Sequence, residues 1–280
     1  ASPLLGRPAG WIFCNATAYA DSFALYCEYI AETWEKEEPP KLGFITWDNA
    51  FGKGMLTEEC LAYVKALGID IIEPPQFIPY MPVDTTPQLL ALDKVGVDYI
   101  FSSMTPTVHA IILKDAERLG LIPKIQFATA SWTLEEGTIR MGGTAAEGVE
   151  GLDPFAYGTE LEIPGVRLAK EACDKYHPGE FWLDGNNMMY TGDYVFPMLA
   201  IEAFKIALER KGYPITGADV KLALETIKGY DAEGLTGPID FTEGERFLRY
   251  CRVGKVVNGK LTPVTDFREM PYFPTITMAY

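Results

Sequence analysis

The sequence predicts an α/β fold built on doubly wound parallel sheets, because strand, loop and helix units recur along its first half. Residues 41–47 are a short apolar and β-prone run, residues 48–54 have turn composition, and an amphipathic stretch follows to Leu67. Similar units begin near residues 69 and 97. Strands therefore start roughly every 25 to 30 residues, which is the length of one βα unit, and a strand that leads directly into a helix is typical of a parallel sheet.

The other elements up to residue 153 follow from hydrophobic spacing and from glycines that can end helices. Residues 11–14 have strand composition and lead through a turn into a helix from about Asp21, whose carboxylate is placed to cap it. Gly68 and Gly120 can end the helices that precede them. The further elements that we expect are helices at 89–92 and 108–119, a strand at 125–128, a short helix near 134–141 and a strand at 145–152.

Beyond Pro154 the pattern changes to long helices and then returns to strands. The expected helices are 164–176, 188–211 and 218–228, and the expected strands are 237–241, 247–257 and 261–264. Thr216 with Asp219 resembles a capping box, and Asn258-Gly259 predicts a hairpin turn. The three helices have few strands to cover, although amphipathic helices need a partner for their apolar faces. The lobe that they form is therefore expected to be incomplete.

The composition argues against disorder and against binding to nucleic acid or membranes. The chain has 280 residues, 48% of them hydrophobic, and a formal charge of −15. Phosphate backbones and anionic lipids attract concentrations of Lys and Arg, which such a charge opposes. No run of about 18 uncharged apolar residues is present, so no membrane span is expected. The five cysteines lack metal-binding or redox spacing, and Cys27 and Cys60 are expected to be buried small hydrophobes.

Three loops are expected to share one edge of the sheet. Ligands of parallel sheets bind beyond the carboxyl ends of the strands, which places loops 48–54, 102–107 and 129–133 on one rim. The Gly-Lys-Gly sequence in the first loop lacks the flanking residues of a phosphate loop. In the same loop, Phe51 either points over the rim or packs on its own helix.

The second and third loops carry hydroxyls and a tryptophan. Ser103 and Thr105 lie where hydroxyls and free backbone N–H groups can hold a polar ligand group, although helix capping alone would explain a threonine there. Ser131 and Trp132 follow the next strand, and an aromatic anchor beside hydroxyls is typical of small-molecule pockets. His109 is expected at the surface or in a capping role, because no nucleophile motif accompanies it.

Tyr190 belongs to a polar group that precedes a long helix and could face the same cleft. The group also contains Asn186, Asn187 and Asp193, for which helix capping and a surface position are the alternatives. No pair of carboxylates can be nominated as catalytic, and no metal site is expected.

Four segments follow one another in an order that is typical of one family. They are KLGFITWDNAFGKG at 41–54, VDYIF at 97–101 with DAERLGL at 115–121, AAEGV at 145–149 and GLTGPIDF at 234–241. Together they extend over nearly the whole chain. They resemble the type I periplasmic solute-binding proteins, in the branch that includes the leucine, isoleucine and valine receptors of ABC transporters.

The resemblance implies two α/β lobes that close over a small ligand without chemical change. Three crossovers, near 15–18, 153–157 and 243–246, would join the lobes, and a membrane permease would receive the ligand. The implied division is a remnant of the first lobe at 1–15, the second lobe at 16–153, helices of the first lobe at 154–243, and return strands with a tail at 244–280. Family members are longer at the N-terminus, so we expect a fragment, a separately encoded partner or loss by processing.

The ligand site that the resemblance implies is only partly carried over. The expected residues are Phe51, Ser103, Met104, Thr105, Ser131, Trp132 and Tyr190. Where amino-acid receptors of this family place an acidic residue against the ligand ammonium, this chain has Ser131 followed by Trp132. A buried ammonium without a carboxylate is costly, so an aromatic acid, an amide or another less cationic solute fits better than an α-amino acid.

The resulting expectation is an exported substrate-binding component of an ABC importer, without a cofactor and with its signal peptide removed, in the periplasm or on the outer face of the cytoplasmic membrane. Two alternatives remain open at this point. One is a sensor domain of the same fold that reports ligand to a signalling partner. The other is an α/β hydrolase, which would need a nucleophile and a base within hydrogen-bond reach.

Overall fold

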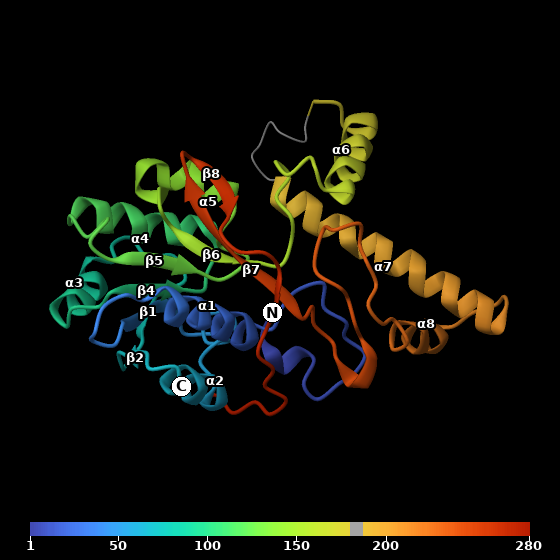
Figure 1. The fold of residues 1–280 in the computed structure, drawn as a ribbon, viewed down its shortest axis with the longest axis horizontal. Coiled ribbons are helices and arrows are strands. Elements are labelled where there is room, and N and C mark those ends of the chain that lie inside the picture. Colours follow the sequence, from blue (N-terminus) through green and yellow to red (C-terminus); the bar gives the residue numbers. More distant parts are fainter. Residues whose placement is uncertain (180–186) are drawn as a thin grey trace.

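The computed structural model describes residues 1–179 and 187–280 and has two parts (Figure 1). The sheet region contains the strands β1 (Lys41–Trp47), β2 (Asp70–Ile71), β3 (Gln76–Ile78), β4 (Tyr99–Ser102), β5 (Gln126–Thr129), β6 (Glu150–Asp153), β7 (Tyr250–Val257), β8 (Lys260–Pro263) and β9 (Arg268–Glu269). Its helices are α1 (Tyr19–Thr33), α2 (Glu58–Ala66), α3 (Thr86–Lys94), α4 (Pro106–Arg118) and α5 (Glu136–Gly142). The helical region contains α6 (Pro164–Tyr176), α7 (Asn187–Lys211) and α8 (Gly217–Leu224), and α7 extends away from the sheet region.

The sheet confirms the parallel α/β fold that the sequence predicts. Its strands are ordered β2-β1-β4-β5-β6-β7-β8, with β3 beside β1 and β9 beside β7. The pairs from β2 to β6 are parallel, and β7 joins β6 in antiparallel register. In this order the loop after β4 lies between the loops after β1 and β5, so three carboxyl ends are neighbours.

Alternate residues of the strands enter two separate cores, one on each face of the sheet. In β1, Leu42 and Phe44 pack in the core that also contains Phe23 of α1, whereas Ile45 packs in the core that contains Ile112 of α4. All five side chains are fully buried. A central parallel strand that is covered by helices on both faces needs such a nearly continuous apolar run.

Local sequence signals set several of the element ends. Gly68, Gly120 and Gly212 follow α2, α4 and α7 with φ of 85°, 69° and 75°, which confirms the expected helix ends. Thr216 and Asp219 form the expected capping box at α8. The β7–β8 hairpin turns at Asn258 and Gly259, whose φ values of 51° and 68° suit the predicted two-residue turn.

Backbone hydrogen bonds are made at all three predicted crossovers, near 15–18, 153–157 and 243–246. The Cys14 N–H donates to the Arg246 carbonyl at 2.7 Å, and the Leu248 N–H donates to the Ala16 carbonyl at 2.9 Å. The Ala156 N–H donates to the Leu235 carbonyl at 2.7 Å. The chain around the predicted crossover at 15–18 is therefore bonded to the chain around that at 243–246. The crossover at 153–157 is bonded to the helical region.

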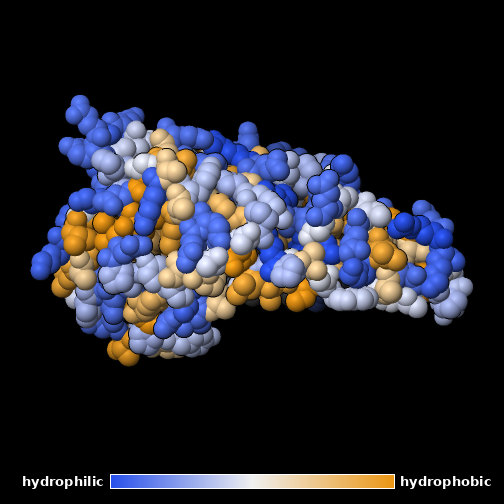
Figure 2. Space-filling model, turned by 90° about the horizontal axis from the view of Figure 1, so that it is seen from below, coloured by the Kyte–Doolittle hydropathy of each residue, from blue (hydrophilic) through white to orange (hydrophobic). Residues whose placement is uncertain are grey.

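The helical region exposes apolar side chains. Among its described residues up to 243 this region contains helices and one isolated bridge, between Tyr230 and Ile239, but no strand of the sheet. Phe196 and Phe204 of α7 remain 61% and 48% exposed. Apolar residues are accordingly visible among polar ones on the part of the surface built by α7 and α8 (Figure 2).

Several predicted elements differ from the structure. Residues 11–14 and 237–241 are not strands: the first makes one backbone hydrogen bond, from Cys14 to Arg246, and the second only an isolated bridge between Ile239 and Tyr230 and a bond from Phe241 to Ile227, so neither joins a ladder. Residues 143–146 form a 3-10 helix, so β6 begins five residues later than the strand expected from residue 145. The last helix ends at Leu224 and not at residue 228. Asn186 lies outside the described residues.

Asp21 does not cap α1, contrary to the sequence prediction. The helix begins at Tyr19, and its N-cap residue Ala18 makes no side-chain bond. The Asp21 carboxylate is instead fully buried and accepts hydrogen bonds of 2.8 and 2.6 Å from Arg7 and of 2.8 Å from Arg249. Two guanidinium groups from distant segments therefore bind this carboxylate through charge-assisted hydrogen bonds.

Candidate functional site

The loops after β1 and β4 are joined by hydroxyl groups at the sheet edge. The Thr46 hydroxyl lies within hydrogen-bond distance of the Gly52 carbonyl, at 2.8 Å, and of the Ser103 carbonyl, at 3.0 Å. The Ser103 hydroxyl donates to the Phe51 carbonyl at 3.3 Å. The two loops therefore support each other where the sequence predicts a shared rim.

The loops after β4 and β5 are joined in the same way. The Thr129 hydroxyl and the Ala130 N–H both donate to the Ser102 carbonyl, each at 3.0 Å. Beyond them, the Thr133 hydroxyl donates to the Met104 carbonyl. Adjacent parallel strands thus bring three predicted loops into one continuous rim, as expected for the ligand edge of an α/β sheet.

Phe51 forms an aromatic wall with two other residues. Its ring stacks on Tyr19 with centroids 5.2 Å apart, and Trp47 meets it edge-on at 5.7 Å. Tyr19 is the first residue of α1 and directly follows the crossover at 15–18. A Cβ on Gly54 would approach the Tyr19 ring to 2.7 Å, so a glycine is needed here for the close packing of the loop on α1. The Phe51 ring is partly buried and packs against both cores, and its contact with a ligand stays a prediction.

The loop after β4 includes the hydroxyl of Thr105. Thr105 is the N-cap residue of α4, but its side chain makes no capping bond, and the side chain is only half-buried. Capping therefore does not account for its hydroxyl. Met104, in contrast, is fully buried in the core beneath the rim, so its side chain supports the loop from below.

Ser131 and Trp132 line a narrow hollow between the rim and the helical region. The other residues around it are Pro154, Phe155 and Met188, and they pack so closely that no space in it is large enough for a water molecule. The Trp132 and Phe155 ring centroids are 6.4 Å apart. Ser131 is only 3% exposed, and its Oγ has no hydrogen-bond partner among the described residues. A buried hydroxyl without a partner is costly, so a ligand atom that bonds to it would gain free energy.

Two carboxyl groups lie behind this hollow. Glu136 Oε1 accepts a hydrogen bond of 3.3 Å from the Met188 N–H, and burial raises the pKa of Glu136 to about 7. Asp153 ends β6 and accepts a hydrogen bond of 2.5 Å from the Tyr157 hydroxyl, and burial raises its pKa to about 8. Both surroundings disfavour negative charge.

Tyr190 lies apart from the other predicted site residues. Burial, the charge on Cys173 and a hydrogen bond to Cys173 of α6 raise the pKa of the Tyr190 hydroxyl. Thr191 and Gly192, and not Tyr190, form the part of α7 that contacts the second predicted crossover, at 153–157. The Thr191 hydroxyl donates to the Ala156 carbonyl at 2.7 Å, and the Gly192 backbone packs against the Phe155 ring.

His109 is neither at the surface nor a capping group, which corrects the sequence prediction. It is fully buried, and neither ring nitrogen has a hydrogen-bond partner among the described residues. Burial lowers its pKa to about 3, so the ring is neutral at physiological pH. The apolar face of α4 includes this position, and the sequence could not distinguish an inward from an outward histidine in the first turn.

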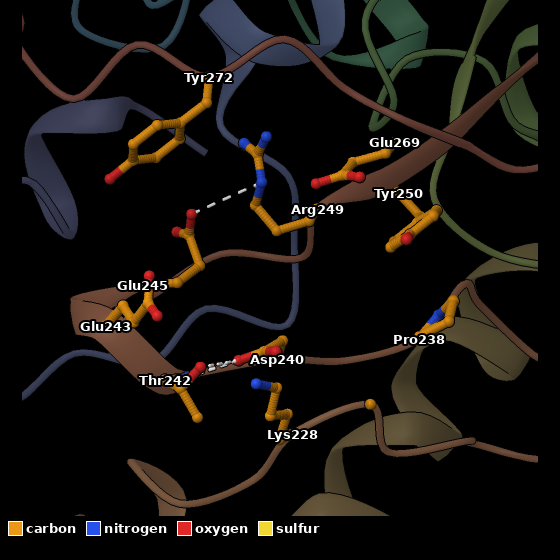
Figure 3. Close-up of a pocket in the computed structure, with 11 residues that line it drawn as sticks. Lys228, Pro238, Asp240, Thr242, Glu243, Glu245, Arg249, Tyr250, Glu269 and Tyr272 are labelled. Atoms are coloured by element: carbon orange, nitrogen blue, oxygen red, sulfur yellow. Dashed lines mark hydrogen bonds and ion pairs between the residues drawn. The ribbon is translucent and has the colours of Figure 1, made fainter.

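A larger hollow of about 520 Å³ lies beside the third predicted crossover, at 243–246 (Figure 3). None of the three rim loops lines it. Four carboxylates surround it, from Asp240, Glu243, Glu245 and Glu269. Figure 3 shows Arg249 among them, with its ion pair to Glu245 at 3.7 Å. Because Arg249 also binds the Asp21 carboxylate at 2.8 Å, this hollow is lined by a structural ion-pair network.

The described residues show neither a metal centre nor a membrane-spanning helix. Within the described parts of the chain, no three His, Cys, Asp or Glu side chains are grouped so as to hold a metal ion. No described helix combines the length and the apolar character that crossing a bilayer requires.

Sequence reasoning missed three residues of the site, which are Tyr19, Phe155 and Met188. Each comes from a crossover or from a helix end that is distant in sequence from the rim loops. The position of Tyr19 directly after the predicted crossover at 15–18 is a signal that could have identified it. Phe155 and Met188 carry no comparable signal, because only the tertiary arrangement brings them to Ser131.

Solved structures of transport proteins share this fold. A branched chain amino acid ABC transporter protein from Thermus thermophilus, with bound valine, has a TM-score of 0.80 and 28% identity, over 92% of this chain and 67% of that chain. A fatty acid ABC transporter substrate-binding protein from Thermomonospora curvata has a TM-score of 0.75 and 20% identity, over 92% and 64%. An ABC transporter substrate binding protein from Aeropyrum pernix has a TM-score of 0.71 and 20% identity, over 93% and 66%.

The chain thus spans about two thirds of the length of these structures. No curated protein sequence matches it. The sequence profile of the periplasmic binding protein family matches residues 6–260, which is most of the chain and includes all three rim loops. The chain therefore belongs to the periplasmic binding protein family of solute-binding proteins.

Proposed function

We propose that this chain forms the ligand-binding wall of an exported solute receptor that delivers a small organic solute to the permease of an ABC importer. The observation that carries the proposal is the continuous rim of three loops. It presents a buried hydroxyl at Ser131 that has no hydrogen-bond partner in the described part of the chain, the Thr105 hydroxyl, and aromatic surfaces at Phe51 and Trp132. Uncharged aromatic walls with a few polar atoms are typical of small-molecule sites.

The crossovers support binding by closure. The rim touches the helical region through Phe155 and Met188, which belong to the second crossover and to the start of α7. The Asn15 side chain donates a hydrogen bond of 2.8 Å to the Gly192 carbonyl, so the first crossover also bonds to α7. A ligand that contacts both sides favours the closed arrangement by the free energy of the additional contacts.

The proposed function involves no chemical change of the solute. A hydrolase would need a base within reach of a nucleophilic hydroxyl. The Ser103 hydroxyl is bonded to the Phe51 carbonyl, and the His109 ring is buried with no hydrogen-bond partner in the parts of the chain that the structure describes. These arrangements favour binding over catalysis. Delivery to a permease and export from the cytoplasm are part of the same proposal and are supported by the family to which the chain belongs.

Thermal shift measurements on the whole chain test the proposal. The panel contains amino acids, aromatic acids, amides and short fatty acids. A ligand at a hundred times its Kd should stabilise the folded chain by about 2.7 kcal/mol and raise the Tm accordingly. The absence of a shift with every compound would contradict the proposed function.

Thr105 and Thr107 provide a matched pair of variants for the same assay. Thr105 is half-buried at the end of the rim loop and belongs to the proposed site, whereas Thr107 lies exposed in the first turn of α4. T105A should reduce the ligand-induced shift, because one ligand hydrogen bond is lost, at a cost of about 1 kcal/mol. T107A should leave the shift unchanged. Equal effects of the two substitutions would place the ligand elsewhere.

A further inference from the structure

Asp153 and Arg252 face each other across two strands of the sheet without forming an ion pair. They are direct partners in the antiparallel register of β6 and β7, and both are buried. The side chains of such a pair lie on the same face of a sheet, with Cβ atoms about 4.5–5.5 Å apart. The Arg252 guanidinium is nevertheless paired with Glu160, to which it donates a hydrogen bond of 2.8 Å from Nη1 and a second one from Nη2.

The Tyr157 side chain contacts both members of this cross-strand pair. Its hydroxyl donates a hydrogen bond of 2.5 Å to Asp153, and the Arg252 guanidinium lies 4.3 Å from the centre of its ring. Gly254 of β7 leaves room for the hydroxyl, because a Cβ there would lie 1.8 Å from the hydroxyl oxygen and 3.2 Å from Asp153 Oδ2. Tyr157 therefore occupies a slot in the sheet that a glycine keeps open.

Tyr157 and Glu160 are anchored in the helical region. The preceding residue, Ala156, is bonded to that region twice: its N–H donates to the Leu235 carbonyl at 2.7 Å, and its carbonyl accepts a bond of 2.7 Å from the Thr191 hydroxyl of α7. Glu160 in turn accepts a bond of 2.6 Å from the Tyr157 N–H. A rotation at the second predicted crossover thus moves both side chains relative to β6 and β7.

The protonation of Asp153 depends on this arrangement. The titratable and charged side chains that interact with it among the described residues are Tyr157, Glu160, Glu136 of α5, and Cys251 and Arg252 of β7. Burial raises the pKa of Asp153 to about 8, although the Tyr157 hydrogen bond and the Arg252 charge act against the rise. Burial also raises the pKa of Cys251, so its thiol is neutral. Direct pairing with a guanidinium has the opposite effect and lowers the pKa of a carboxyl group.

We propose that Tyr157 is a proton-linked latch of the second crossover: when the helical region swings away, Tyr157 leaves its slot, Arg252 exchanges Glu160 for Asp153, and Asp153 releases a proton to solvent water. Closure reverses each change and takes the proton up again. Glu160 is hydrated in the open arrangement, because it moves with the crossover. The inference rests on the closure that the proposed function includes.

The ratio of closed to open chains should therefore fall as the pH rises. Between the ordinary pKa of 3.8 and about 8, Asp153 holds its proton in the closed arrangement and has lost it in the open one. Each pH unit within this window lowers the closed-to-open ratio by up to about tenfold. Above the window Asp153 is ionised in both arrangements, so the ratio becomes constant.

Single-molecule fluorescence energy transfer on the whole chain tests the latch without a ligand. Dyes are attached at K114C and K205C, because Lys114 of α4 and Lys205 of α7 are exposed, and C14S removes the partly accessible native thiol. A second population with a different transfer efficiency should grow as the pH rises from 5.5 to 7.5, and the ratio of the first population to the second should fall by at least about tenfold. Efficiency distributions that coincide at the two pH values would overturn the inference.

Two substitutions assign the effect to one carboxyl group. D153N cannot ionise and should keep the closed population at both pH values. E136Q removes a neighbouring carboxyl group whose pKa burial raises to about 7, and it should retain the pH-dependent shift of the original chain. Loss of the shift in E136Q together with its retention in D153N would contradict the role of Asp153.

Failure of the latch can be distinguished from failure of the proposed function. If a compound of the thermal shift panel binds while the transfer efficiency ignores pH, the chain is still a solute receptor and only the latch is wrong. If the efficiency responds to pH and no compound of the panel binds, the proposed function is wrong and the latch stands.

Discussion

The Tyr157 hydroxyl donates a hydrogen bond of 2.5 Å to the Asp153 carboxylate at the point where β6 leads into the second crossover. Asp153 is fully buried, and its other oxygen has no hydrogen-bond partner among the described residues. The Arg252 guanidinium lies 4.3 Å from the centre of the Tyr157 ring and is ion-paired with Glu160. This arrangement links the sheet region to the crossover through a carboxyl group that burial keeps protonated.

The stability of the chain should depend on pH through Asp153. Burial raises its pKa from 3.8 to about 8 in the folded chain. Between these two values the unfolded state loses the proton while the folded state retains it, so the free energy of unfolding falls as the pH rises. D153N removes this titration and preserves an acceptor for the Tyr157 hydroxyl. Relative to the original chain, D153N should therefore gain stability from pH 5 to pH 8.

Urea unfolding at several pH values measures this effect. The difference between D153N and the original chain should grow by more than about 1.4 kcal/mol, the equivalent of one pKa unit. D266N is the control, because Asp266 is exposed in the C-terminal tail. A difference that is constant with pH for D153N would show that Asp153 ionises normally in the folded chain.

Gly254 should be needed where Tyr157 approaches β7. A Cβ at this position would lie 1.8 Å from the Tyr157 hydroxyl oxygen and 3.1 Å from the ring carbon that bears it. G254A should therefore destabilise the chain by about 1–3 kcal/mol, as overpacking does. Gly217 has open space around its Cβ position, so G217A serves as the control and should cause little loss.

The same contact can be tested by a double-mutant cycle. Y157F removes the hydroxyl that the new Cβ would meet. G254A should thus cost less in the Y157F background, with a coupling of about 0.5–3 kcal/mol. Additive effects of the two substitutions would indicate that the cost of G254A has another origin.

The sequence predicted those parts of the site that depend on neighbours along the chain. The run at 41–47 is apolar on both faces and is followed by turn residues, so its strand, its helix and the position of Phe51 could be derived. The same reasoning placed Ser103, Thr105, Ser131 and Trp132 on one rim, because parallel strands end at the same edge. The hydroxyl bonds between the loops confirm this rim.

The parts that the sequence did not predict depend on contacts between distant segments. Asp21 has the features of a helix cap, but Arg7 and Arg249 bind it from segments 14 and 228 residues away. Tyr190 occurs in a polar group that suggested a cleft, whereas the structure places it beside Cys173. Local propensity carries no information about such partners, so these positions could be assigned only from the tertiary arrangement.

The buried ion pair of Asp21 should be important for stability. D21N leaves the guanidinium groups of Arg7 and Arg249 with a neutral partner in a site where the Asp21 side chain is fully buried. Breaking such a pair costs about 3–5 kcal/mol. Glu32 forms an exposed pair with Arg268, so E32Q should cost about 1 kcal/mol or less. Urea midpoints compare the two variants, and equal losses would contradict the structural role of Asp21.

The five thiols should differ strongly in reactivity. Cys27, Cys60 and Cys251 are fully buried, and burial raises the pKa of each well above its usual value. Cys173 is only 3% exposed, whereas Cys14 is partly accessible. Iodoacetamide should therefore modify Cys14 first in the folded chain, and all five thiols after unfolding in urea. Peptide mass mapping that finds Cys27 or Cys60 modified as fast as Cys14 would contradict the burial of these residues.

A crystal structure of the chain with the compound that gives the largest thermal shift is the most direct test of the central claim. We expect ligand density against Phe51, Thr105 and Trp132, with one ligand atom within hydrogen-bond distance of Ser131 Oγ. Density in the carboxylate-lined hollow beside Arg249, or at any place away from the three rim loops, would contradict it.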